Sequence, residues 1–264
     1  MAAVSNALHV VEANYMGYRR TWRGRIISTF LNPVLFLAGM GFALGTMVDR
    51  QAGEAQLPIP FLTFVATGLL AANAMQTGFG EGAWPVMAGI KWRKTFEAVI
   101  VTPLAVTDLI NGMLIWAGIH LFFTLGVFAA IAVLFEAIEP LPALIALIPA
   151  VLGGLAFQAT ATAITSRLED ETGLTTMMRF GIVPMFLFSG TFFPISQLPD
   201  WLEPVAVATP LFHAVELVRK LALPDVGSPV VTTMPIWIHV VYLLAMTAVG
   251  WVLAIRFLRQ RLMK

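Results

Sequence analysis

Residues Leu109–Phe135 read LINGMLIWAGIHLFFTLGVFAAIAVLF, a stretch of 27 residues without a single Asp, Glu, Lys or Arg. A helix of about 20 apolar residues is long enough to cross the roughly 30 Å hydrocarbon core of a bilayer. Because that core holds no water to hydrogen-bond a free backbone, a segment that crosses it must be helical or shielded within protein. The stretch therefore predicts a transmembrane helix.

Five further stretches of 20 or more residues share this lack of charge. They are Ile26–Val48, Ala55–Gly80, Pro140–Ser166, Phe180–Pro199 and Val226–Ile255. Together the six stretches predict an all-α, polytopic membrane protein, with a single transmembrane domain over residues 1–264. We expect its six transmembrane helices at residues 26–48, 59–80, 105–135, 141–166, 173–192 and 234–257.

The composition leaves little room for any other kind of domain. Hydrophobic residues make up 58% of the 264 residues and charged residues 12%, about half the share usual in soluble domains. We therefore expect no soluble catalytic domain. The chain has no cysteine, which excludes disulfides and thiol nucleophiles. Membrane lipids are expected partners, and nucleic acid is not.

The distribution of Lys and Arg predicts the orientation, because cytoplasmic loops carry an excess of both. With the N-terminus inside and six crossings, twelve of these residues are cytoplasmic: Arg19, Arg20, Arg23, Arg25, Lys91, Arg93, Lys94, Arg167, Arg256, Arg259, Arg261 and Lys264. The outside then holds only Arg50, Arg219 and Lys220. We therefore expect both termini in the cytoplasm.

Residues 1–25 are predicted to form an amphipathic helix before the first span. Its apolar positions recur at spacings of 3 and 4: Leu8, Val11, Tyr15, Tyr18 and Trp22. A helix with aromatic residues on one face and arginines elsewhere lies in the membrane interface. The alternative is a solvated cytoplasmic tail.

The cytoplasmic loop at residues 81–104 is far longer than the 2–8 residues that usually connect two helices. Gly80, Gly82 and Pro85 are predicted to end the preceding helix. Within the loop, Lys91–Val101 is a short amphipathic segment with a basic start and an apolar end. A long loop of this kind in a small membrane protein usually has a function.

The outer segment at residues 193–220 contains Pro194, Pro199, Pro204 and Pro210, a spacing that no continuous membrane helix tolerates. Being apolar but too short to span, it is predicted to form a re-entrant hairpin that closes an exit. The residues of this expected gate are Ser189 and Gly190, which end the fifth span, Pro194 and Pro199 around the first turn, Trp201 at the interface, and Pro210 and His213 on the return piece. That piece is expected to end near water at Glu216, Arg219 and Lys220. The alternative is a rigid outer cap without a part in transport.

The sequence shows no catalytic or metal-binding constellation. The histidines His9, His120, His213 and His239 are scattered, without a carboxylate at ligand spacing. The charge-free stretches also hold no proton relay of the kind that ion-coupled transporters need. Arg179, near the start of the fifth span, either reaches the inner interface for structural reasons or faces a substrate path. A transport function would therefore draw its energy from another protein.

Two motifs carry a resemblance to a known family. They are KWRKTFEAVIVTPLAVTDLINGML (Lys91–Leu114) and FLFSGTFFP…LPDWL…PLFHAVELVR (Phe186–Arg219). Over nearly its full length the chain resembles the type-2 family of bacterial ABC exporter membrane subunits, in particular the nodulation-protein-J, lipo-oligosaccharide exporter branch. The resemblance implies a non-catalytic homodimer in the cytoplasmic membrane with two copies of an ATPase subunit. That partner would bind ATP and Mg, and this chain would bind no cofactor or metal.

The resemblance also implies which residues dock the ATPase. In the family, the loop between spans two and three enters a groove of the ATPase, and the matching residues are Lys91, Trp92, Arg93, Lys94, Thr95, Phe96 and Glu97. Trp92 and Phe96 are expected to be the buried anchors. The expected cargo is an amphipathic molecule, namely a glycolipid or lipid-linked saccharide. The alternatives are a drug-efflux permease of the same family and an ion-coupled secondary transporter.

Overall fold

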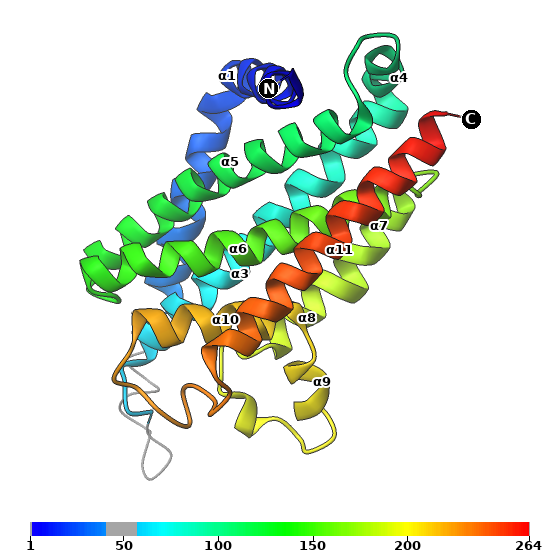
Figure 1. Cartoon of the computed structure of the whole chain (residues 1–264). Coiled ribbons are helices and arrows are strands. Elements are labelled where there is room, and N and C mark those ends of the chain that lie inside the picture. The colour runs from blue at the N-terminus through cyan, green and yellow to red at the C-terminus, as the bar shows by residue number, and fades with distance from the viewer. Residues whose placement is uncertain (1, 41–56, 264) are drawn as a thin grey trace.

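The computed structural model describes residues 2–40 and 57–263, and helices account for all of its regular secondary structure in that part of the chain. Five long helices form its body: α1 (Ala2–Leu37), α3 (Phe61–Met87), α5 (Val106–Leu134), α6 (Pro140–Thr165) and α11 (Ile236–Leu262). Shorter ones connect them: α4 (Thr95–Ile100), α7 (Thr172–Met177), α8 (Val183–Phe188), α9 (Glu203–Val207) and α10 (Pro210–Ala222). Figure 1 shows α4 and both termini toward one end, and α9 and α10 toward the other.

Three of the described helices, α5, α6 and α11, are long and apolar enough to cross a membrane. The bounds of α5 and α6 lie within one residue of the predicted 105–135 and 141–166. The continuous helical run Thr172–Phe188, at the expected fifth span, is apolar but shorter. The chain is therefore an all-helical membrane protein.

The helix expected at 59–80 does not end at its glycines. α3 continues to Met87, and the π-helical turn Ala88–Trp92 extends it further, so the prediction that Gly80, Gly82 and Pro85 break the helix is wrong. The reason is packing against α6. A Cβ at Gly82 would lie 2.3 Å from the Gln158 carbonyl oxygen. A glycine in this helix therefore allows close approach of a neighbour, as is common between membrane helices.

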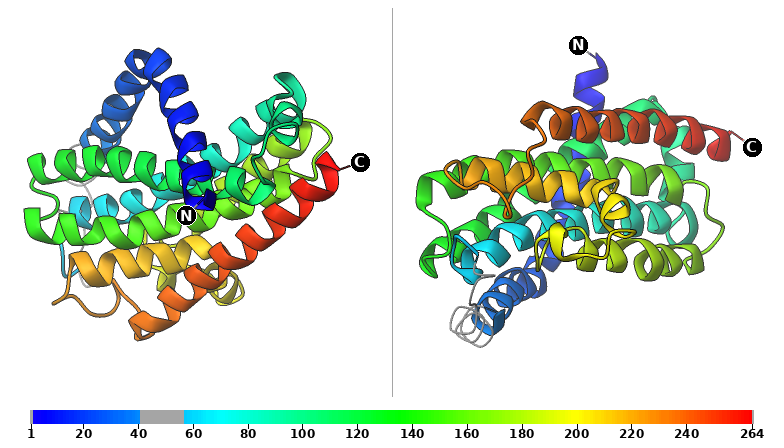
Figure 2. Two further views of the ribbon diagram at one scale, coloured as in Figure 1. Left: turned by 45° about the horizontal axis from the view of Figure 1, so that its top comes forward. Right: turned by 90° about the horizontal axis from the view of Figure 1, so that it is seen from below.

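α1 joins the expected interfacial helix and the start of the expected first span without an interruption. Figure 2 shows that it bends, and that its first arm crosses α5. At the crossing, Asn6 donates a hydrogen bond to Asp108, and a Cβ at Gly112 would lie 2.5 Å from Cβ of Val10. The side chain of Trp22 and residues 41–48 of the first span lie outside the described residues.

The centre of the body is α6, which packs against α3, α5, α10 and α11. Small residues line these contacts. A Cβ at Gly78 of α3 would lie 2.0 Å from the carbonyl oxygen of Gly154, and one at Gly250 of α11 would lie 2.7 Å from the Thr160 nitrogen. Backbones this close leave no space for side chains, so dispersion contacts between α3, α6 and α11 are dense.

Candidate functional site

The expected docking residues lie where the π-helical turn Ala88–Trp92 meets α4. Lys94 has a φ of 51°, a left-handed conformation that reverses the chain direction between the two helices. The side chains of Lys91, Trp92, Arg93, Lys94, Thr95 and Glu97 are exposed. Trp92 is 53% exposed, an unusually large apolar surface beside two cations.

Phe96 differs from this expectation, because it points into the chain. Its side chain is only 7% exposed, and a Cβ at Gly89 would lie 2.4 Å from its ring. In this structure the ring therefore presents no surface to a partner, in contrast to the expected role of Phe96 as an anchor. It instead holds α4 against the end of the preceding helix, and the surface open to a partner is formed by its neighbours.

The expected gate residues gather in the segment 189–222, between α8 and the end of α10. Ser189 and Thr209 share a hydrogen bond of 2.7 Å, and the Thr209 hydroxyl caps the first turn of α10. Gly190 has a φ of +84°, which ends the helical run at α8. Pro210 is the first residue of α10. One pair of hydroxyls therefore joins the start of this segment to the start of α10.

The remaining expected gate residues precede α9, where Pro194 is buried and Pro199 and Trp201 are exposed. Pro194 precedes the 3-10 turn Ile195–Gln197, and the carbonyl of Pro199 accepts a hydrogen bond from the Leu202 nitrogen. Trp201 is 72% exposed. Its position suits a residue at a membrane–water interface.

Arg219 is buried, and the prediction that it ends α10 near water is wrong. It is 2% exposed, with its guanidinium carbon 3.7 Å from the ring centroid of Phe64. Nη2 donates to the carbonyls of Phe64 (3.1 Å) and Thr191 (3.4 Å), and Nε donates to the Thr67 hydroxyl (3.4 Å). Burial lowers the pKa of Arg219 to about 9, and the charge of Glu216 opposes this shift. The guanidinium therefore stays charged at neutral pH.

Glu216 is buried as well, one turn earlier on α10. Its Oε2 accepts hydrogen bonds from the Thr232 nitrogen (2.8 Å) and hydroxyl (2.7 Å), and lies 3.8 Å from Nζ of Lys220. Lys220 also donates to the carbonyl of Met234. These contacts attach the chain after α10 to the helix itself.

His213 and His239 are not scattered, as the sequence suggested, but lie in contact between α10 and α11. Their Nδ1 atoms are 2.9 Å apart, and the ring of Tyr242 stacks on His213 at 3.9 Å between centroids. Burial lowers the pKa of His213. The pair is separated by 26 residues, so no local pattern reveals it. The one available signal was the spacing of 213, 216 and 219, which places three polar residues on one face of a short apolar helix.

A second imidazole pairs with a carboxylate inside the helical body. Nδ1 of His120 on α5 lies 3.1 Å from Oε1 of Glu81 on α3, and both side chains are largely buried. Tyr18 and Trp116 complete the cluster, since the ring of Tyr18 meets both Trp116 and His120 edge to face. The sequence assigned Glu81 to a loop, so this contact was missed.

One face of α3 is polar and partly open. We call it the α3 polar stripe, and its members follow one another at spacings of 3 and 1: Asn73, Gln76, Thr77, Gly80, Glu81 and Trp84. Gln76 is exposed, Trp84 is 38% exposed, and a Cβ at Gly80 would meet nothing within 4 Å. An exposed amide on a long helix of a membrane protein indicates a surface that faces something other than lipid.

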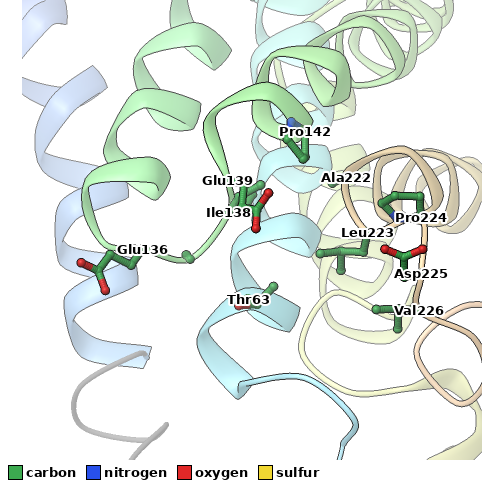
Figure 3. Close-up of a pocket in the computed structure, with 11 residues that line it drawn as sticks. Thr63, Glu136, Ile138, Glu139, Pro142, Ala222, Leu223, Pro224, Asp225 and Val226 are labelled. Carbon is green, nitrogen blue, oxygen red and sulfur yellow. The ribbon is translucent and has the colours of Figure 1, made fainter.

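Two other features lie apart from these groups. Arg179 is exposed, within the π-helical turn Met178–Ile182 between α7 and α8. A cavity of about 360 Å³ lies between the α5–α6 turn and the chain after α10 (Figure 3). Of its carboxylates, Glu136 and Glu139 come from the α5–α6 turn and Asp225 comes from the chain after α10. No group of three potential metal ligands occurs in the part of the chain that the structure describes.

Comparison with known proteins agrees with this architecture. The family model of the ABC-2 type transporter matches residues 7–223. Nodulation protein J of Rhizobium meliloti (strain 1021) is 28% identical over 258 residues, covering 98% of this chain and 94% of the relative. Nodulation protein J of Rhizobium leguminosarum bv. viciae is 27% identical over 259 residues, covering 98% and 96%. The chain belongs to the ABC-2 type transporter family.

Proposed function

We propose that this chain is the membrane-spanning permease subunit of an ATP-driven exporter in a bacterial cytoplasmic membrane. The observation that carries the proposal is the match of the ABC-2 transporter family to residues 7–223. The unit is a homodimer of six-span subunits with two copies of a separate ATPase, which binds ATP and Mg. Both termini and α4 face the cytoplasm, in keeping with the excess of Lys and Arg there.

The segment 189–222 then lies at the outer side as a re-entrant hairpin that closes the exit. Its short helices α9 and α10 and its exposed Trp201 support this placement. On the inner side, Trp92 with Arg93, Lys94 and Glu97 forms the docking surface. An exposed aromatic residue with a charged rim is typical of binding hot spots.

The proposed cargo is a glycolipid or lipid-linked saccharide. The α3 polar stripe supports it, because amides and hydroxyls both donate and accept hydrogen bonds, as sugar hydroxyls require. Asn73 and Thr77 hydrogen-bond to each other across one turn, and Gln76 remains exposed beside them. An uncharged polar head would follow this stripe while its lipid part stays in the bilayer.

An ion-coupled secondary transporter is the second candidate, favoured by the contact between Glu81 and His120. Intramembrane pairs of this kind carry protons in pumps and transporters. The two functions differ in their source of energy. In inverted membrane vesicles, we expect uptake of a labelled glycolipid to require ATP, to stop with vanadate and to continue when a protonophore removes the proton gradient. Uptake that follows the gradient without nucleotide would overturn the exporter.

The cargo has a separate test in the lipid profile of a strain that lacks this chain. We expect a glycolipid to disappear from the outer envelope fraction and to accumulate in the cytoplasmic membrane. An unchanged profile together with new drug sensitivity would instead establish drug efflux within the same family.

A further inference from the structure

The inner end of α3 is fixed to the short helix α4 by one buried ring. Phe96 fills the space above Gly89, where a Cβ would lie 2.4 Å from the ring. The ring also joins a buried cluster with Val86 and Ile90 on the same helical run, and with Leu109 of α5. A side chain larger than hydrogen at position 89 would displace the ring, so α4 and the end of this run are held in one arrangement.

The outer end of α3 is fixed to the segment 189–222 by Arg219. The guanidinium bridges two elements: it donates to the Phe64 carbonyl and the Thr67 hydroxyl of α3, and to the Thr191 carbonyl of the turn after α8. Gly68 permits this junction, since a Cβ there would lie 2.4 Å from the Thr191 oxygen and 3.1 Å from Nη2 of Arg219. Moving α10 away from α3 would leave a buried charge without its acceptors, which is strongly unfavourable.

Between these junctions the helix is continuous. No residue between Phe61 and Trp92 leaves the helical conformation. Gly89 and Phe64 are 25 residues apart, so the junctions are separated by about 38 Å at 1.5 Å per residue. A displacement at one end of a continuous helix reaches the other end without an intervening loop that could absorb it.

We propose that Phe96 and Arg219 are positioning residues that fix α4 and the segment 189–222 to opposite ends of α3, so that α4 and the segment move together. This inference rests on the proposed function, in which α4 contacts the ATPase and the segment closes the exit. Neither residue contacts the cargo. Each acts by keeping its segment attached to α3, so that a movement at the ATPase changes the exit.

The test follows the outer segment while the nucleotide state changes at the inner side. Because the chain has no cysteine, Val205→Cys on α9 provides a single attachment site for bimane, and Val205 is 56% exposed. The labelled chain is purified with its co-purifying ATPase and placed in nanodiscs. Bimane emission is then compared without nucleotide and after trapping with ATP and vanadate. We expect a clear shift of emission in the otherwise unchanged chain.

The variants Arg219→Lys and Phe96→Ala should lose this nucleotide-dependent shift while ATP hydrolysis continues. Lysine keeps the charge but cannot bind both Phe64 and Thr191 with a planar fork. The matched controls are Arg259→Lys and Phe123→Ala, both at exposed positions, which should keep the full shift. A purely structural role would change the amount of folded protein without removing the response to nucleotide.

Two milder variants keep the test decisive if the first pair does not fold. Thr67→Val removes one acceptor of Arg219, and Gly89→Ala displaces the ring of Phe96, and each should reduce the shift. A full shift in every folded variant, or no shift in the unchanged chain, would overturn the proposal. Failure of the proposed function gives a different result, because no nucleotide-hydrolysing protein would then co-purify with the chain.

Discussion

The Nδ1 atoms of His213 and His239 lie 2.9 Å apart, a distance at which one nitrogen must donate a proton and the other must accept it. The contact joins α10 to α11 and exists only while the two rings share a single proton at these positions. A second proton would place two cations against each other. The ring of Tyr242 stacks on His213 at 3.9 Å between centroids, on one side of the pair.

This contact predicts a loss of stability at acidic pH. Burial lowers the pKa of His213 below its ordinary value of 6.5, so the folded protein binds this proton less readily than the unfolded chain. The stabilising contribution is therefore complete above pH 6.5 and is lost as the pH falls below it. We expect the midpoint of thermal unfolding in detergent to decrease between about pH 7.5 and 5.5.

The variant His239→Asn distinguishes the contribution of this pair to the pH dependence of stability from that of the other histidines. Asparagine keeps a neutral donor near the position of Nδ1 and cannot become charged in this range. Part of the pH dependence should therefore disappear. An identical decrease in parent and variant would show that the pair does not determine the pH response.

Gly78 and Gly80 lie two residues apart on α3. Alanine substitutions at these two positions should change the free energy of unfolding in opposite directions. A Cβ at Gly78 would lie 2.0 Å from the Gly154 oxygen, whereas one at Gly80 would meet nothing within 4 Å. Overpacking costs about 1–3 kcal/mol, so Gly78→Ala should lower the free energy of unfolding. Gly80→Ala should raise it by about 0.5–1 kcal/mol, the gain expected for alanine over glycine within a helix. Denaturant unfolding measures both, and equal effects would contradict the packing of α3 on α6.

Substitutions at Trp92 and Phe96 should have different effects, one on ATPase binding and the other on folding stability, although both residues are aromatic and lie in the same predicted loop. Trp92→Ala removes an exposed hot-spot residue, so ATPase binding should weaken by about 2 kcal/mol, or about 30-fold. Phe96→Ala empties a buried site and should cost about 3–5 kcal/mol of folding stability. Titration of the ATPase and thermal unfolding measure the two effects, and Phe123→Ala should change neither. A Trp92 variant that binds normally would remove this surface from the docking site.

Gln76 tests the path of the cargo along the α3 polar stripe. Gln76→Leu removes one exposed amide, and a lost neutral hydrogen bond of about 0.5–1.5 kcal/mol should slow glycolipid uptake by about 2- to 10-fold. Folding should not suffer, because the leucine faces a surface that is already exposed. Gln260→Leu, near the C-terminal end of α11, is the control and should leave uptake unchanged. Equal uptake in both variants would exclude the stripe as the path.

Much of the helical architecture follows from apolar runs alone. α5 and α6 end within a residue of their predicted bounds, because charged or proline-containing turns border an uninterrupted apolar stretch. The prediction for the end of α3 was wrong for a physical reason. Glycine ends a helix in isolation, but Gly82 is required where the α6 backbone approaches, and a single sequence does not show which neighbour will come close.

The site was less predictable because its contacts join distant segments. Arg219 and Glu216 were assigned to water, as charged residues at the end of a short helix usually are, yet both are buried by partners on α3 and after α10. The basic segment around Trp92 was predicted, whereas the inward position of Phe96 depends on Gly89, and no local pattern connects these two residues. Local sequence patterns identify the helices, whereas contacts between residues far apart in the sequence determine where α3 is joined to α4 and to the segment 189–222.

The hydrogen bond between Asn6 and Asp108 has a consequence for biosynthesis. The two residues are 102 positions apart, so the first arm of α1 leaves the ribosome well before the part of α5 on which it rests. At about 5–20 residues per second, the interval is about 5–20 s. During that time the arm has no α5 to cross, and its apolar face must be covered by the membrane surface or by the insertion machinery. The first arm of α1 thus reaches its final contacts late.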